Sequence, residues 1–483
     1  MPGVSLSEYI IESGDAMWQR IRIEKIKISN IRNVHFGEIS FACARSKNEV
    51  EPGMDILGLY GQNGSGKTVF IDVLRLLKSL LTGGSLSDEF PFFISDGKEE
   101  ASVEYSFLCE FVNGDVYHYV YYVEFAQEEK SHFNDIELFD LEFEKKPVIV
   151  REVLSISGNI DGKKIRFQPI IDTATENIPF GPAVKYKKWF VKNEQSARII
   201  DLNMGVAEKE NRSRIFTKRV FDIVCNAFGD EYVQLTDMIQ SLKDFAVNNF
   251  FVLSTDLTNN IRKNTTINIY TQRGFVELDV KNPTHMPEDF FNELSSTIDN
   301  INLALEQLIS GYKIGLKPVG RRMTKKGVEV LDVELISCKR GLEIPLRFES
   351  DGIRKMISCL QLIISAYNNP GITVAIDELD AGVFEYLLGE LLIIMEETGQ
   401  GQFIFTSHNL RPLEVINKKF LYFTTINPEN RYIKLKYVRD KNNLRDTYFR
   451  EIIFGGQDEE LYNNTKRYRL AAALRKAGGC FEK

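Results

Sequence analysis

Residues 61–68 form a glycine-rich segment that could bind the phosphates of a nucleotide. They have the sequence GQNGSGKT, a complete GxxxxGKT motif. Its glycines let successive backbone N–H groups turn toward phosphate oxygens, while Lys67 can reach the outer phosphates and the Thr68 hydroxyl can bind Mg²⁺. The members of this phosphate-binding loop are Gly61, Gln62, Asn63, Gly64, Ser65, Gly66, Lys67 and Thr68.

Asp377 and Glu378 form an acidic pair that could complete such a site. They follow ITVAI, an apolar run that is too short for a helix and therefore predicts a buried parallel strand. The carboxyl end of such a strand is where a parallel sheet presents its ligands. We expect Asp377 to hold Mg²⁺ through water and Glu378 to act as the base, or to orient water, for attack on the terminal phosphate. Taken alone, such a pair is more often a solvated loop feature.

Two further segments supply weaker candidates. His408 follows a second apolar strand, QFIFT, so that a terminal phosphate could accept its hydrogen bond, although a lone histidine is more often structural. Ser350 and Gly352, in the sequence FESDG, precede a predicted amphipathic helix. Taken alone, they are an ordinary capping motif.

Strands and helices predicted from apolar periodicity would position these groups. Residues 55–60 predict a short strand, and residues 69–81 have apolar side chains at helical spacing up to Thr82-Gly83-Gly84. Because a strand and a helix flank residues 61–68, a chance glycine-rich turn is disfavoured there. Alternating isoleucines and charged residues predict an opening strand over residues 20–28, with a slip of register at Glu24-Lys25.

The pattern of strands and helices along the whole chain predicts an α/β fold. In this fold, a mixed sheet with parallel core strands is joined to an antiparallel β subdomain. An antiparallel meander is expected over residues 101–156. The predicted segments are residues 1–160 with the phosphate-binding loop and the meander, 161–310 as an inserted, mostly helical subdomain, 311–440 with the acidic pair and His408, and 441–483 as a helical tail. The candidate helices of the insert are residues 212–228, 232–247 and 287–309.

Composition limits the classes of protein that fit. The 483 residues suggest two to four domains, and a net charge of -8 would repel nucleic acid unless the basic residues gather on one face. Six cysteines without a CxxC pair argue against a zinc site or a disulfide framework, and favour a reducing cytosol. No apolar run approaches the ~18 residues that span a bilayer, so we expect neither export nor a membrane.

Four segments together resemble the ABC-type ATPase heads of the RecF, SMC and OLD group. In chain order they are the phosphate-binding loop, the FESDG segment, the acidic pair and the segment with His408. This resemblance covers roughly the first 100 and the last 150 residues and leaves the helical middle uncovered. It implies an ABC-type P-loop ATPase head whose halves are residues 1–160 and 311–440, with ATP and Mg²⁺ as cofactors. In that group, the segment that matches Ser350 and Gly352 is the signature motif, which contacts the γ-phosphate held by Lys67 of another protomer. A homodimer or a higher homo-oligomer follows from this.

The same resemblance implies roles for other residues. Asp380 would belong to the D-loop and His408 would be the switch histidine, while Arg32 or Asn33, in SNIRNV, would contact the nucleotide. Gln127 and Gln168 are both candidates for the glutamine loop.

Two differences between this sequence and the group argue against some of the functions found in the group. Thr68 and Ser350 are too close in sequence for the coiled-coil arms of SMC proteins, and no heptads are present. The chain after His408 contains no DxD, which argues against the Toprim nuclease domain of OLD proteins. What remains resembles the stand-alone ATPases of the PARIS and Septu anti-phage systems, which are encoded beside a separate effector.

The sequence therefore predicts a cytoplasmic ATPase that oligomerises around nucleotide and controls a partner effector, such as a nuclease, in anti-phage defence. Two basic stretches, residues 320–327 and 466–476, could recognise a partner, although charge runs are usually solvated faces. One alternative is a RecF-like DNA-binding repair clamp, and another is an ATP-binding scaffold with little turnover. DNA is therefore retained as a candidate partner.

Overall fold

The computed structural model describes most of the chain, with gaps. The described residues are 18–42, 53–86, 93–112, 114–129, 145–160, 163–174, 181–190, 194–217, 233–254, 266–271, 274–323, 327, 329–381, 383–436, 443–463 and 466–478.

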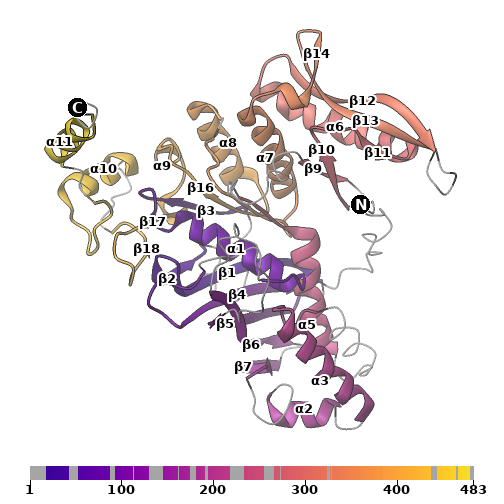
Figure 1. Cartoon of the computed structure of the whole chain (residues 1–483), viewed down its shortest axis with the longest axis vertical. Coiled ribbons are helices and arrows are strands. Elements are labelled where there is room, and N and C mark those ends of the chain that lie inside the picture. Colours follow the sequence, from indigo (N-terminus) through magenta and orange to yellow (C-terminus); the bar gives the residue numbers. More distant parts are fainter. Residues whose placement is uncertain are drawn as a thin grey trace, which may run out of the picture.

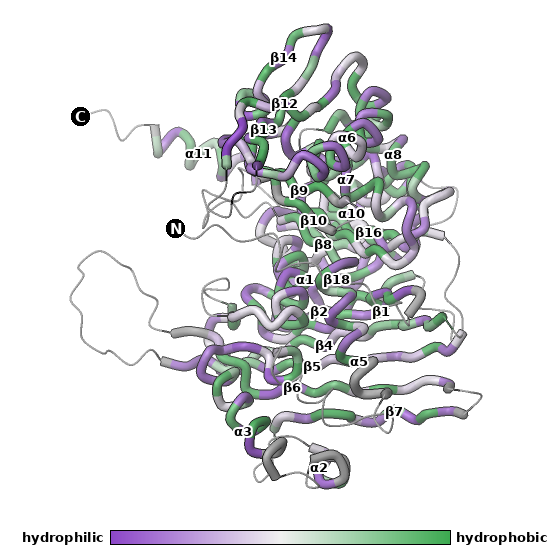
Figure 2. The backbone as a smooth tube through the Cα atoms, turned by 90° about the vertical axis from the view of Figure 1, so that its right-hand side faces the viewer, coloured by the Kyte–Doolittle hydropathy of each residue, from purple (hydrophilic) through white to green (hydrophobic). Residues whose placement is uncertain are grey.

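A six-stranded antiparallel sheet forms the lower half of the molecule (Figure 1) and has the order β2-β1-β4-β5-β6-β7. Its strands are β1 (Trp18–Ile31), β2 (Val34–Ser40), β4 (Glu100–Phe111), β5 (Val116–Glu129), β6 (Lys145–Ile160) and β7 (Lys163–Asp172). The alternate isoleucines of β1 are buried, and a β-bulge lies between Ile23 and Lys25, where the sequence predicts a slip of register. The predicted opening strand and meander are confirmed. Figure 2 shows the stacked strands with hydrophobic and hydrophilic segments alternating along them.

A second six-stranded sheet carries the phosphate-binding loop and has the order β18-β17-β3-β16-β15-β8. Its strands are β3 (Asp55–Tyr60), β8 (Phe250–Leu253), β15 (Thr373–Ile376), β16 (Gln402–Thr406), β17 (Leu421–Thr424) and β18 (Tyr432–Ile433). All neighbours are parallel except β17 and β18. The buried parallel strands predicted from ITVAI and QFIFT are thus confirmed, and the α/β fold class with parallel core strands and an antiparallel β subdomain is confirmed as well.

Helix α1 (Lys67–Leu81) lies between the two sheets. Its apolar side chains share one core with residues of both sheets, and the Tyr105 hydroxyl of β4 donates to the Val73 carbonyl of α1 at 2.8 Å. The helix ends at Thr82, as the sequence predicts. Helix α5 (Val233–Asp244) and the π-helical turn Phe245–Asn249 complete this layer and lead directly into β8.

The opposite face of the parallel sheet is covered by helices (Figure 1). These are α7 (Asp351–Asn368), α8 (Glu385–Thr398), α9 (Pro412–Val415) and α10 (Leu444–Phe454). Helix α7 also reaches a third core, because Met356 and Ile357 belong to that core while Leu362 and Ile363 belong to the core of the parallel sheet. The predicted amphipathic helix after FESDG is confirmed.

The third core belongs to an upper lobe. Its elements are β9 (Thr266–Thr271), β10 (Gly274–Asp279), β11 (Thr284–Met286), α6 (Glu288–Leu308), β12 (Tyr312–Met323), β13 (Glu329–Lys339) and β14 (Leu342–Pro345). The remaining helices are α2 (Ala183–Phe190), α3 (Glu194–Lys209) and α11 (Arg467–Gly478). No helix in the described ranges is long and apolar enough to cross a membrane.

Residues 161–310 do not form the single helical subdomain that the sequence suggests. Strand β7 extends the antiparallel sheet, β8 extends the parallel sheet, and β9 to β11 belong to the upper lobe. The helix expected over 212–228 is absent from residues 212–217, and residues 218–228 lie outside the described part of the chain. At Ser213 the side-chain oxygen accepts from the backbone N–H groups of Ile215 and Phe216, a local arrangement that competes with a helix.

One buried glutamine joins the two sheets. The side-chain oxygen of Gln402, at the start of β16, accepts from the Ile23 N–H at 3.0 Å, and its amide nitrogen donates to the Ile23 carbonyl at 2.8 Å. The same nitrogen donates to the Asp55 carboxylate at 2.8 Å. Gln402 therefore fixes β1 against the start of both β16 and β3.

Lys78 ties the end of α1 to β8. Its ammonium donates to the Phe250 carbonyl at 2.7 Å and lies 5.1 Å from the centre of the Phe251 ring. Burial lowers the pKa of Lys78 from its ordinary value of 10.5 to about 8. The folded state therefore disfavours the protonated lysine more than the unfolded state does.

We expect the free energy of unfolding to rise with pH between about pH 8 and pH 10 because of Lys78. The unfolded chain holds this proton up to a higher pH than the folded chain, so the penalty for burying the charge is present below pH 8 and is relieved above it. Between pH 7.5 and pH 9.5 the parent should gain about 1–2 kcal/mol relative to the Lys78→Met variant. Urea unfolding of both proteins at the two pH values measures this gain. A difference between them that does not change with pH would contradict the assignment.

Candidate functional site

The phosphate-binding loop connects β3 to α1 and leaves the start of the helix open. Gly64 and Gly66 have φ values of 73° and 101°, in the left-handed region that favours glycine. Helix α1 begins at Lys67 without a side-chain cap and with no acidic residue in its first turn. Its first N–H groups and the positive end of its dipole are therefore available to an anion.

The loop rests on the next two strands of the sheet. The Ser65 and Thr424 hydroxyls are hydrogen bonded, and the buried Tyr432 hydroxyl donates to the Gly66 carbonyl at 2.8 Å. A Cβ atom at Gly61 would lie 1.6 Å from the Thr424 side-chain oxygen, so only glycine fits there. Thr424 and Tyr432 have no signal in the local sequence, because only the strand order β18-β17-β3 brings them under the loop.

Lys67 lies against its own loop. Its Nζ donates to the carbonyls of Gly61 and Gln62 at 2.7 and 3.0 Å. Burial lowers the pKa of Lys67, and the nearby carboxylates of Asp377 and Glu378 partly oppose that shift. The acidic pair is therefore close enough to Lys67 for the three charges to interact.

The acidic pair is held by Thr406 at the end of β16. The Thr406 hydroxyl donates to the buried Asp377 carboxylate and accepts from the Glu378 N–H at 2.8 Å. Glu378 has a φ of 50°, a left-handed conformation that is strained for a residue with a side chain. Thr406 was also missed by the sequence analysis, although a polar residue ending an apolar strand is the signal that could have found it.

These groups face one cavity of about 550 Å³. Its lining residues are Arg32, Asn33, Asn63, Gly64, Gly66, Lys67, Thr68, Val69, Asp377, Glu378 and His408. The structure thus brings together four segments that are far apart in the sequence: Arg32 and Asn33, the phosphate-binding loop, the acidic pair, and His408. Gly61, Gln62 and Ser65 do not line the cavity and form the base of the loop.

Three other predicted residues lie outside this cavity. Ser350 is exposed at the start of α7, where its side chain accepts from the Ile353 N–H at 3.3 Å, and Gly352 is in the first turn of the same helix. The Asp380 carboxylate accepts from the N–H groups of His408 and Asn409, both at 3.2 Å. Asp380 therefore holds the turn that presents His408.

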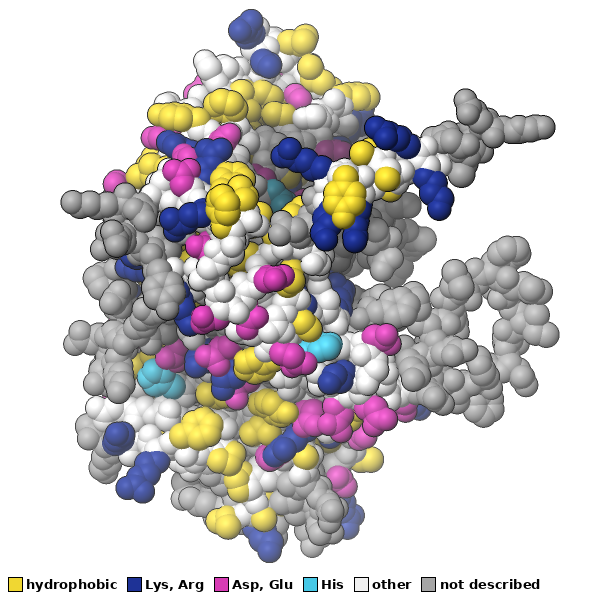
Figure 3. Space-filling model, turned by 90° about the vertical axis from the view of Figure 1, so that its left-hand side faces the viewer, with side chains coloured by type: hydrophobic (Ala, Val, Ile, Leu, Met, Phe, Trp, Pro, Cys, Tyr) yellow, Lys and Arg dark blue, Asp and Glu magenta, His cyan; other side chains and the backbone are white. Residues whose placement is uncertain are grey.

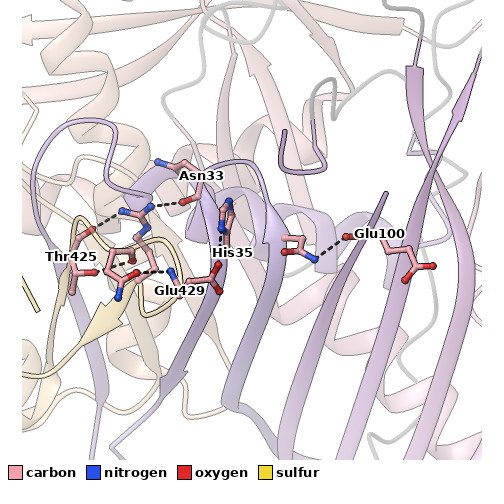
Figure 4. Close-up of polar contacts among 8 residues, drawn as sticks. Asn33, His35, Glu100, Thr425 and Glu429 are labelled. Carbon is pink, nitrogen blue, oxygen red and sulfur yellow. Dashed lines mark hydrogen bonds and ion pairs between the residues drawn. The ribbon is translucent and has the colours of Figure 1, made fainter. Parts of the chain in front are cut away.

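The turn between β1 and β2 forms one wall of the cavity. The Arg32 guanidinium pairs with the buried Asp72 carboxylate of α1 at 2.5 Å, so it is held by an ion pair as well as facing the cavity. The Asn33 amide donates to the Gly64 carbonyl of the phosphate-binding loop. The Arg431 guanidinium donates to the carbonyls of Asn33 and Thr425, which fixes this turn to the loop after β17. Figure 4 shows Asn33 and Thr425 close together in this region.

Neither candidate for the glutamine loop lies at the cavity. Gln127 is on β5 and Gln168 on β7, both in the antiparallel sheet. On the side of β15 away from β16 lies β8, and its Leu253 carbonyl accepts from the Asp377 N–H at 2.8 Å. Spacing could not identify this neighbour, because it depends on the strand order of the parallel sheet.

The donor set fits Mg²⁺ and a nucleoside triphosphate. The Asp377 carboxylate and the Thr68 hydroxyl are hard oxygen ligands, and Mg²⁺ commonly takes its other ligands from water and phosphates. The described residues contain no cluster of three or more His, Cys, Asp or Glu side chains that could hold a metal. Bound Mg²⁺ would neutralise charge on the phosphate oxygens.

Comparison of the sequence with protein-family models and with curated proteins gives no match. Among solved structures, the chain is similar to an SMC head bound to the C-terminal winged-helix domain of ScpA, at 13% identity and a TM-score of 0.39 over 86% of this chain and 98% of that one. It is similar to the SMC head domain from Thermotoga maritima at 12% identity and a TM-score of 0.32, covering 86% and 99% of the two chains. It is also similar to the recombination mediator RecF with ATP, at 13% identity and a TM-score of 0.30, covering 80% of this chain and 94% of that one.

We expect the Gly61→Ala variant to bind ATP at least about fivefold more weakly than the parent. The added methyl group overlaps the Thr424 hydroxyl, and overpacking of this kind costs about 1–3 kcal/mol, which the loop can relieve only by moving. Titration with a fluorescent ATP analogue measures the affinity. Gly97→Ala is the matched control, because Gly97 has a positive φ of 73° with nothing within 4 Å of the added Cβ. Equal affinities of the two variants would contradict the role of Thr424 as the support of the loop.

Proposed function

We propose that this protein is an ABC-type ATPase head that binds ATP with Mg²⁺, hydrolyses the ATP to ADP and phosphate, and uses the nucleotide state to control a partner. The observation that carries this proposal is the single cavity that unites Lys67 and Thr68 with Asp377, Glu378 and His408. A glycine loop at an open helix start can bind phosphates, an acidic pair at a strand end can bind Mg²⁺ and orient water, and a histidine just after the neighbouring strand can contact the terminal phosphate, which together suit phosphoryl transfer to water.

Each residue has a chemical task in this proposal. The N–H groups of the loop and the Lys67 ammonium bind the β- and γ-phosphates, and Thr68 and Asp377 hold Mg²⁺. The Glu378 carboxylate, fixed at its backbone by Thr406, accepts a proton from the attacking water or orients that water. His408 donates a hydrogen bond to the terminal phosphate. Most of the rate enhancement then comes from positioning and charge stabilisation.

We further propose that two copies complete each other's sites. Ser350 and Gly352 lie outside the cavity of their own chain, and Ser350 is exposed to a second copy. Two aromatic side chains are also largely exposed: Phe348, two residues before Ser350, has an exposed fraction of 70%, and Phe384, four residues after Asp380, has one of 74%. Exposed apolar groups next to polar recognition groups are typical of a surface that another chain covers.

Helix α11 is our candidate for the surface that meets a separately encoded effector, such as a nuclease, and anti-phage defence is our proposed setting. All its described side chains are exposed, and Tyr468 and Leu474 have exposed fractions of 66%. In Figure 3, Lys, Arg and apolar side chains gather on this projecting helix. Its basic groups are also where duplex DNA would bind if the protein were a repair clamp.

We expect Glu378→Gln to retain ATP while hydrolysis falls at least ~100-fold, because the amide keeps the shape of the carboxylate and loses its basicity. Lys67→Ala should instead abolish ATP binding and leave the fold intact. Phosphate release and nucleotide titration separate the two effects, with circular dichroism as the check on folding. A Glu378→Gln variant that hydrolyses ATP near the parental rate would remove Glu378 from this role.

A mixing experiment tests the composite site. We expect Ser350→Arg protomers to bind ATP without hydrolysing it, and Lys67→Ala protomers to be inactive. A mixture of the two should recover activity, because each mixed dimer has one site with the Lys67 of one chain and the Ser350 of the other. If freely exchanging protomers show no recovery, each chain works alone and the trans arrangement is wrong.

A further inference from the structure

Lys355, on α7, binds the backbone of the acidic pair from the side opposite Thr406. Its Nζ donates to the Glu378 carbonyl at 2.7 Å and to the Asp377 carbonyl at 3.1 Å. The Glu378 carbonyl also accepts from the Ala381 N–H at 3.0 Å. Lys355 is therefore the contact that joins this turn to a helix rather than to its own sheet.

The turn at Glu378 needs such support. With a φ of 50°, Glu378 is in a conformation that costs about 1–3 kcal/mol unless its surroundings impose it. Thr406 binds the Glu378 N–H and Lys355 binds the Glu378 carbonyl, so the two peptide groups that flank its Cα atom are held from β16 and from α7. The direction of the Glu378 carboxylate depends on both contacts, because the backbone rotation sets where the side chain starts.

Helix α7 connects this turn to distant parts of the molecule. Its N-cap is Ser350, about one and a half turns before Lys355. Met356 and Ile357, next to Lys355, are part of the core of the upper lobe, while Leu362 and Ile363 belong to the core of the parallel sheet. A helix shared by two cores moves as a unit when the lobe moves, and Lys355 moves with it.

We propose that Lys355 is a positioning residue that makes hydrolysis at its own chain's Glu378 depend on the position of α7. A contact at Ser350, or a force on the upper lobe, fixes the position of α7. The ammonium of Lys355 transmits that position to the two backbone carbonyls of the acidic pair. ATP binding does not need this contact, because Lys355 is not among the residues that line the cavity. The inference rests on the proposed function and adds its regulation.

The first experiment separates turnover from binding. We expect Lys355→Met to lower kcat at least ~10-fold while its affinity for a fluorescent ATP analogue stays within about twofold of the parent, since only the orientation of Glu378 is affected. Lys355→Arg, which keeps the charge and can donate to both carbonyls, should recover part of the lost kcat. Lys78→Met is the matched control, because Lys78 also donates to a backbone carbonyl of the parallel sheet but lies far from the acidic pair in the sequence and contacts β8. Its kcat should remain near the parental value.

The second experiment places the substitution in one chain of the mixed dimer described above. The active composite site uses the Glu378 of the Ser350→Arg chain and the Ser350 of the Lys67→Ala chain. Lys355→Met should abolish the recovered activity when it is in the Ser350→Arg chain and should leave most of it when it is in the Lys67→Ala chain. A general disturbance of α7 would act through Ser350 and give the reverse order.

The outcomes distinguish this inference from the proposed function. A parent protein without ATPase activity overturns the proposed function and this inference with it. An active parent whose kcat is unchanged in Lys355→Met, equal losses in Lys355→Met and Lys78→Met, or the reverse order in the mixed dimer each overturn the role of Lys355 alone.

Discussion

The candidate site exists because several parallel strands end at the same edge of one sheet. Register fixes this edge, since Ile376 of β15 pairs with Phe405 of β16, and Thr406 of β16 pairs with Leu59 of β3. The residues that follow these strands are therefore neighbours, although they come from opposite ends of the chain. The register in turn is anchored at the other end of the strands, where Gln402 replaces water as the hydrogen-bonding partner of Ile23 and Asp55.

Around this edge, side chains from other strands hold the backbone in positive-φ conformations. Gly66, for which a positive φ has no steric cost, is held by Tyr432, and Glu378, for which it is strained, is held by Thr406. The strain at Glu378 persists only where the surroundings determine the geometry more than once. The cavity is thus shaped before any nucleotide arrives, and binding energy need not be spent on forming the loop.

Much of the fold and of the site could be predicted from local sequence patterns. The phosphate-binding loop, the strand before Asp377 and the strand before His408 each have a pattern that is complete within about ten residues, which is the range over which periodicity is informative. The supports of the site could not be found in this way, because Thr424, Tyr432 and Lys355 reach it only through the order of strands and the packing of α7. The interpretation of residues 161–310 as one helical insert failed for the same reason. Short strands such as β8, with four residues, acquire their identity from the partner strand and not from their own composition.

The position of β3 in its sheet also determines the order in which the chain can fold on the ribosome. The six strands of the antiparallel sheet, β1, β2 and β4 to β7, are complete by Asp172 together with α1, so the lower half can form while synthesis continues. Strand β3 is made equally early, but both of its neighbours, β16 and β17, lie after residue 400. Until they emerge, β3 has two unpaired edges and one face of α1 is uncovered, which is a surface prone to aggregation. A chain truncated before residue 400 would therefore leave this surface exposed.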